Sequence, residues 1–159
     1  MASVFELAAE CGPDRVVAER FAEHFRDTSW TLPQGLESRC AATIHQDSDS
    51  NWWVSVLPSG LSRSGIGGEE DARLMTQIGH LLCERLRTAS NYRYALVGVE
   101  SEDFRYFSEL DDDLVTLPFQ GLVVCEAIWE RLGRPTAFVP FEPGYFWRPY
   151  TGEVYGSKV

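Results

Sequence analysis

The sequence predicts an α+β fold in which about four helices pack on a mainly antiparallel sheet of four to five strands. Three observations lead to this prediction. The chain has 159 residues with 44% apolar content, which suits one globular domain spanning residues 1–159. Residues 69–88 carry an apolar stripe at helical spacing, and residues 40–57 contain two β-rich runs around a polar turn.

Four segments are predicted to be helical. Ser3 and Glu6 have the spacing of a capping box, so a short helix is expected at the start of the chain. Residues 14–26 repeat apolar side chains every four positions, as an amphipathic helix does. The longest helix is expected over 69–88, and a fourth over 122–132, where a glycine and then a proline follow.

The strands are predicted from β-prone runs bounded by turn residues. Residues 40–45 and 52–57 form the expected hairpin. Residues 92–99 are expected to be a central strand, with 104–110 paired to it. Prolines and aromatic residues alternate over 135–150, which predicts an extended C-terminal wrap pinned to the body of the protein.

The net charge of −10 and the isoelectric point near 4.7 limit the possible partners. Binding to nucleic acid phosphates depends on clustered Lys and Arg, so neither nucleic acid nor an anionic membrane is expected as a partner. No apolar run is long enough to span a membrane, and the start of the chain lacks a basic segment followed by an apolar one. The expected location is therefore the cytoplasm.

The sequence identifies no catalytic residue, metal site or cofactor. Lys158 is the single lysine, which excludes a phosphate-binding loop lysine and a Schiff-base lysine. His80 and Cys83 lie three residues apart on the predicted helix, but a zinc site needs a third or fourth ligand. The cysteines are widely spaced and are interpreted as reduced, mostly buried thiols; they are Cys11, Cys40, Cys83 and Cys125.

The most distinctive feature is the segment 100–113, which we call the acidic segment. It contains seven carboxylates and one arginine around three aromatic residues, a net charge of −6. Such a segment can be an ordinary solvated strand and turn, or it can bind a basic surface. The candidate partner-binding residues are Glu102, Asp103, Phe104, Tyr106, Phe107, Glu109, Asp111, Asp112 and Asp113.

Two classes of function remain open from the sequence. The preferred hypothesis is a non-enzymatic interaction module, an adaptor or an antitoxin-like or immunity-like protein that binds a basic partner. The alternative is a small enzyme or ligand-binding domain with a pocket between the helix 69–88, the strand 94–99 and the aromatic C-terminal segment. Its candidate groove residues are His80, Tyr145, Trp147, Arg148 and Tyr150. The oligomeric state is not predicted.

Overall fold

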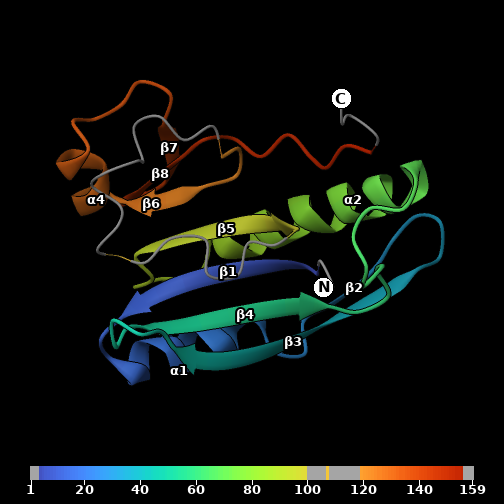
Figure 1. The fold of residues 1–159 in the computed structure, drawn as a ribbon, viewed down its shortest axis with the longest axis horizontal. Coiled ribbons are helices and arrows are strands. Elements are labelled where there is room, and N and C mark those ends of the chain that lie inside the picture. The colour runs from blue at the N-terminus through green and yellow to red at the C-terminus, as the bar shows by residue number, and fades with distance from the viewer. Residues whose placement is uncertain (1–3, 100–106, 108–118, 156–159) are drawn as a thin grey trace.

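The computed structural model describes residues 4–99, 107 and 119–155. Its strands form one antiparallel sheet in the order β2-β3-β4-β1-β5-β6-β8-β7 (Figure 1). In chain order the elements are β1 (Phe5–Gly12), α1 (Arg15–Phe25), β2 (Ser29–Thr31), β3 (Glu37–Gln46), β4 (Trp52–Pro58), α2 (Glu69–Leu86), β5 (Tyr94–Val99), β6 (Val123–Cys125), α4 (Glu126–Arg131), β7 (Val139–Glu142) and β8 (Tyr145–Trp147).

The predicted proportions of helix and sheet are wrong. The described residues form eight strands in one sheet and three helices, not about four helices on four to five strands. Three segments account for most of the difference. They are the start of the chain, the stretch before α4 and the aromatic C-terminal region, and each of them adds strands to the sheet.

The first of these corrections concerns β1, which the sequence predicted as a helix. This strand lies in the middle of the sheet, between β4 and β5, and all eight of its residues are buried. Leu7 and Ala9 belong to the core on one face, and Ala8 belongs to the core on the other. A strand buried on both faces has no alternation of polar and apolar residues, so the sequence carries no clear sign of this strand. The capping-box spacing was the local pattern that remained, and it favoured a helix that strand pairing overrides.

The second correction concerns residues 122–132, predicted as one helix. Here Val123 and Val124 form a short strand before the helix α4 begins at Glu126. Val124 is paired with Tyr94 of β5 on one side and with Phe146 of β8 on the other. β-Branched residues fit such a doubly paired position well, and the pairing outweighs the helical spacing of the apolar side chains.

The third correction concerns the C-terminal region, predicted as a wrap. Residues 139–147 form the antiparallel strands β7 and β8 at one edge of the sheet. Pro140 lies in β7, the outermost strand, and edge strands tolerate proline because one side of their backbone has no neighbouring strand. Beyond Trp147 the chain runs along α2, as Figure 1 shows.

The other predicted elements that lie within the described residues are confirmed. The helices α1 and α2 occupy 15–25 and 69–86, and β3 and β4 form the expected hairpin. Asp14 caps α1 by accepting a hydrogen bond from the Val16 amide, and α2 begins with three carboxylates at the positive end of its dipole. The strand predicted over 92–99 is β5, which pairs with β1 and β6. The strand predicted over 104–110 lies outside the described residues, except for Phe107.

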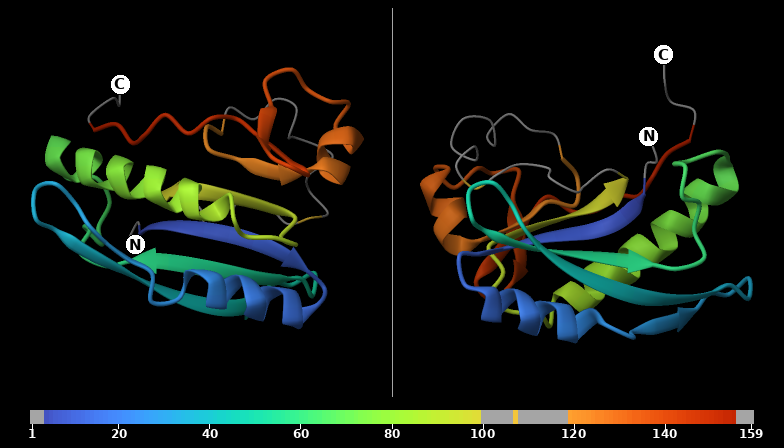
Figure 2. Two further views of the ribbon diagram at one scale, coloured as in Figure 1. Left: turned by 180° about the vertical axis from the view of Figure 1, so that it is seen from behind. Right: turned by 60° about the horizontal axis from the view of Figure 1, so that its bottom comes forward.

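A hydrophobic core lies on each face of the sheet. The helices α1 and α2 pack on the same face, which is turned toward the viewer on the left of Figure 2. Their buried side chains, including Phe21, Phe25, Ile78 and Leu82, form the larger core with one face of the strands. On the opposite face, Ile128 of α4 joins Trp53 and Tyr94 in a second, smaller core.

Candidate functional site

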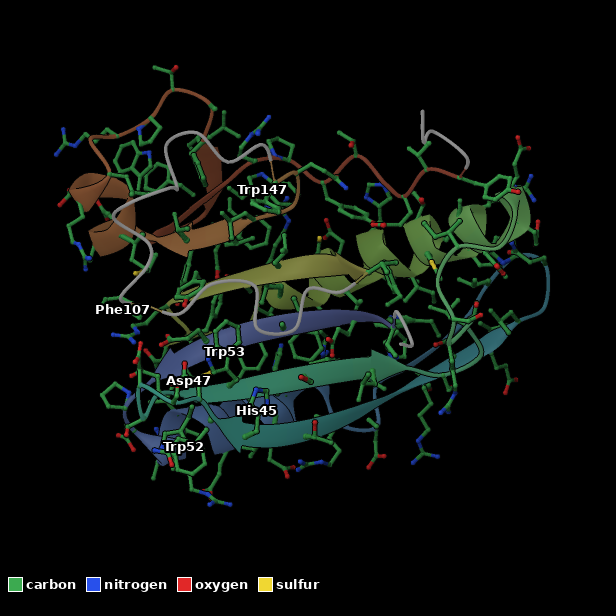
Figure 3. All side chains as sticks on the ribbon, viewed as in Figure 1. His45, Asp47, Trp52, Trp53, Phe107 and Trp147 are labelled. Atoms are coloured by element: carbon green, nitrogen blue, oxygen red, sulfur yellow. The ribbon has the colours of Figure 1, made fainter. Side chains whose placement is uncertain are left out.

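Phe107 is the one predicted partner-binding residue that the structure describes. The other candidates lie outside the described residues; they are Glu102, Asp103, Phe104, Tyr106, Glu109, Asp111, Asp112 and Asp113. Figure 3 places Phe107 at the end of the sheet that also carries Asp47 and Trp52. This end is therefore where the described fold meets the acidic segment.

Two arginines of the chain itself contact the ring of Phe107. The guanidinium carbon of Arg93 lies 3.6 Å from the ring centroid, and that of Arg131 lies 5.0 Å from it. Cation–π contacts of this kind stabilise by about 1 kcal/mol when partly desolvated. The ring is half-buried and packs against the smaller core. Phe107 itself is therefore packed on the body of the protein at this position.

Arg93 is held in place by a buried carboxylate. Its Nε donates to Glu10 Oε1 at 2.7 Å and its Nη2 donates to Glu10 Oε2 at 2.5 Å, while the Gly12 amide also donates to Oε1. Burial alone would lower the pKa of Arg93, but the hydrogen bonds and charge of Glu10 raise it above its ordinary value. The two-point pairing fixes the plane of the guanidinium on which Phe107 rests.

A rigid acidic turn lies at the same end of the sheet. Asp47 Oδ1 accepts hydrogen bonds from the amides of Asp49 and Asn51, and Oδ2 accepts one from Trp53 Nε1 at 2.7 Å. The sequence predicts this turn as the connection between residues 40–45 and 52–57. Asp47 and Asp49 are two residues apart, as neighbouring ligands are in calcium loops. Both carboxylate oxygens of Asp47, however, already accept hydrogen bonds from the protein. Across the described part of the chain, no group of three or more His, Cys, Asp or Glu side chains could hold a metal ion.

The predicted groove residues occupy different environments. His80 is exposed on α2. Its ring forms a T-shaped contact with the ring of Tyr150, and the two ring centroids are 5.0 Å apart. Tyr145 is buried and donates a hydrogen bond to the Tyr92 carbonyl. The Trp147 ring packs on Phe141, and the Arg87 guanidinium lies over it. Arg148 is half-buried, and its backbone forms hydrogen bonds with the backbone of residues 121 and 122. Among the five, the structure thus shows direct side-chain contact between His80 and Tyr150.

The space between α2 and the C-terminal chain is filled by Tyr150. A Cβ atom on Gly79 would lie 2.4 Å from the Tyr150 hydroxyl, so the ring lies directly on the helix backbone. That hydroxyl donates to Glu153 at 2.8 Å, and the Glu153 amide donates to Thr76 of α2. The hollows described for this protein lie elsewhere: beside Arg39 and Arg63, along β3, and between α1 and residues 88–91.

The described cysteines are unpaired, as expected, and three of them are buried. Burial raises the pKa of Cys40 to about 11 and that of Cys83 to about 12, and it raises the pKa of Cys11 further. A cysteine nucleophile requires a thiolate near neutral pH. These three thiols are therefore poor candidates for nucleophilic chemistry and fill space in the larger core.

No protein-family model, curated protein or solved structure matches this chain. In the part of the chain that the structure describes, no helix combines the length and apolar character needed to cross a membrane.

Proposed function

We propose that this protein is a non-enzymatic interaction module that binds a basic protein partner through the acidic segment, as an adaptor or an antitoxin-like or immunity-like inhibitor does. The observation that carries the proposal is the distribution of charge. Residues 100–113 hold a net charge of −6 out of −10 for the whole chain. A basic surface would gain Coulomb energy there, and long-range attraction would accelerate its association.

The ion pairs of the described residues support this proposal. Seven of the thirteen arginines lie within 4 Å of carboxylates that do not belong to the acidic segment. The pairs are Arg15–Glu19, Arg26–Glu23, Arg39–Asp27, Arg73–Glu70, Arg87–Glu84, Arg93–Glu10 and Arg134–Glu130. Within the described residues, each of these arginines therefore has a carboxylate neighbour outside the acidic segment.

The attachment of Phe107 also supports the proposal. Phe107 of the acidic segment lies against the Arg93 guanidinium, which the pairing with Glu10 holds in place. A residue that is held in place before association loses less conformational entropy on binding than a mobile one does. Interfaces commonly combine such an anchored aromatic residue with surrounding charges that select the partner.

The test begins with capture of partners by the full chain from a lysate of its source cell, followed by mass spectrometry. The recovered partner is then titrated calorimetrically at about 50 mM and about 300 mM salt, because surface charges are screened over a shorter distance at the higher value. We expect a basic protein whose dissociation constant rises about tenfold at the higher salt concentration. Equal affinity at both ionic strengths would overturn the proposal.

A pair of matched variants assigns the binding to the acidic segment. The first, E109Q/D111N/D112N/D113N, removes four charges from that segment. The second, E37Q/D49N/E69Q/E126Q, removes four charges from exposed positions elsewhere. The first variant should weaken binding about tenfold and the second less than about threefold. The opposite ranking would show that another surface binds the partner.

The alternative function, a small enzyme or ligand-binding domain with a pocket between α2, β5 and the C-terminal segment, has weaker support. Tyr150 packs against Gly79 in that region, and the predicted groove residues face different neighbours.

A further inference from the structure

A hollow of about 300 Å³ lies beside the beginning of β1 and the end of β4. Phe5 and Pro58, both buried, line it together with the partly buried Val4 and Leu57. Ligand sites in proteins begin at about this volume and are mostly apolar, with a few polar groups that orient the ligand. The hollow therefore has the size and lining of a site for a small apolar molecule.

The charge of this hollow is opposite to that of the protein. Arg39 and Arg63 line it, and none of the described residues that line it is acidic, although the chain contains 24 Asp and Glu residues. Within the described residues, no carboxylate pairs with Arg63. Arg39 contacts Asp27 at 3.0 Å, but this pair is 67% and 68% exposed, and exposed pairs contribute little. Both guanidinium groups can therefore bind an anion.

The loop that forms the rim is fixed by hydrogen bonds. Ser59 donates its amide to the Arg39 carbonyl at 3.0 Å, and its hydroxyl accepts from the Arg39 amide. Ser38 donates to the Ser59 carbonyl at 2.7 Å. Gly60 has a φ of +87° and lies against Leu36, a conformation that another residue would adopt only with strain. These bonds hold the rim in position before any ligand arrives.

We infer that this hollow binds a small apolar molecule that ends in a carboxylate. The apolar part would be buried against Val4, Phe5 and Leu57, and the carboxylate would accept hydrogen bonds from Arg39 and Arg63. Guanidinium groups match the planar carboxylate with two parallel hydrogen bonds, which gives both affinity and orientation. The site is separate from the acidic segment and does not depend on the function proposed above.

The inference is tested by calorimetric titration of the full chain with octanoate. Octanamide has the same length without the charge, acetate has the charge without the apolar chain, and inorganic phosphate is an anion of a different shape. We expect saturable binding of octanoate to one site and affinities at least about tenfold weaker for the other three probes. The inference is overturned if octanoate does not bind, or if any of the three other probes binds as tightly.

Two double variants locate the site. R39Q/R63Q removes both charges from the hollow, and R20Q/R73Q removes two exposed arginines of α1 and α2. We expect R39Q/R63Q to weaken octanoate binding about tenfold and R20Q/R73Q to leave it within about twofold. Octanoate should also shift the amide resonances of Ala41 and Gly60 in the native protein. Equal affinity in the two variants, or shifts confined to other residues, would show that octanoate binds elsewhere.

Discussion

Glu10 and Arg93, 83 residues apart in the sequence, form a two-point ion pair between the end of β1 and the start of β5. The Glu10 side chain is 0% exposed and that of Arg93 is 26% exposed, so solvent screens this pair less than a pair at the open surface. The same guanidinium supports the ring of Phe107. One buried carboxylate therefore links two adjacent strands inside the sheet and positions Phe107 of the acidic segment.

Replacement of Glu10 by Gln should destabilise the protein strongly. The variant leaves the partly buried Arg93 charge without its partner, and loss of one member of a buried pair costs about 3 kcal/mol. The free energy of unfolding is measured with urea. The control is Glu19→Gln, which breaks the exposed pair with Arg15 and should cost about 0.5 kcal/mol or less. Equal effects of the two substitutions would mean that the Glu10 pair contributes no more than a surface pair.

Replacement of Gly79 by Ala should also destabilise the protein, although alanine favours helix formation by about 1 kcal/mol relative to glycine. The added methyl group would lie 2.4 Å from the Tyr150 hydroxyl and 2.6 Å from the ring. Such overpacking costs about 1–3 kcal/mol. The measurement is a double-mutant cycle with Tyr150→Ala, in which Gly79→Ala should become neutral or stabilising. A cost that persists without the Tyr150 ring would contradict this explanation.

The stability of the C-terminal segment should depend on pH through Glu153. Burial raises the pKa of this carboxyl above its ordinary value, although the hydrogen bond from Tyr150 opposes the shift. The folded state then binds the proton more tightly than the unfolded state. As the pH rises from the pKa of Glu153 in the unfolded state to its higher pKa in the folded state, Glu153 therefore destabilises the fold progressively. Urea unfolding should show that the stability of Glu153→Gln, relative to the native protein, increases as the pH rises above the ordinary pKa of a glutamate. The exposed Glu37→Gln gives the background change, and an equal change in both variants would contradict the assignment.

The four thiols should react with iodoacetamide at different rates in the native protein. Cys125 is half-buried, whereas Cys11, Cys40 and Cys83 are buried, and burial raises the pKa of each of these three. Mass spectrometry of protein labelled at about pH 8 should find Cys125 modified first. The other three should be modified at comparable rates only after unfolding in urea. Rapid native labelling of Cys83 would show that the larger core opens at the end of α2.

The elements that could be predicted from the sequence are those whose signal is local. Leu74, Ile78 and Leu82 recur on one side of a helix, and the polar residues 46–51 separate two β-prone runs, so α2 and the β3–β4 hairpin could be located in advance. Part of the candidate site could be predicted in the same way. The charge of residues 100–113 is a property of composition, and it does not require a fold to be seen.

Other features depend on partners that lie far away in the chain. Residues 5–12 became a strand because β4 and β5 pair with both of its edges, and the capping pattern at Ser3 carried no information about those partners. The contact of Arg93 with Glu10 and Phe107, and the approach of Arg39 and Arg63 to one hollow, arise in the same way. Composition and short-range periodicity thus determined the charge, the long helices and one hairpin. The tertiary structure decided the size of the sheet and the position of each site, because strand pairing and burial join residues whose separation in sequence leaves no local pattern.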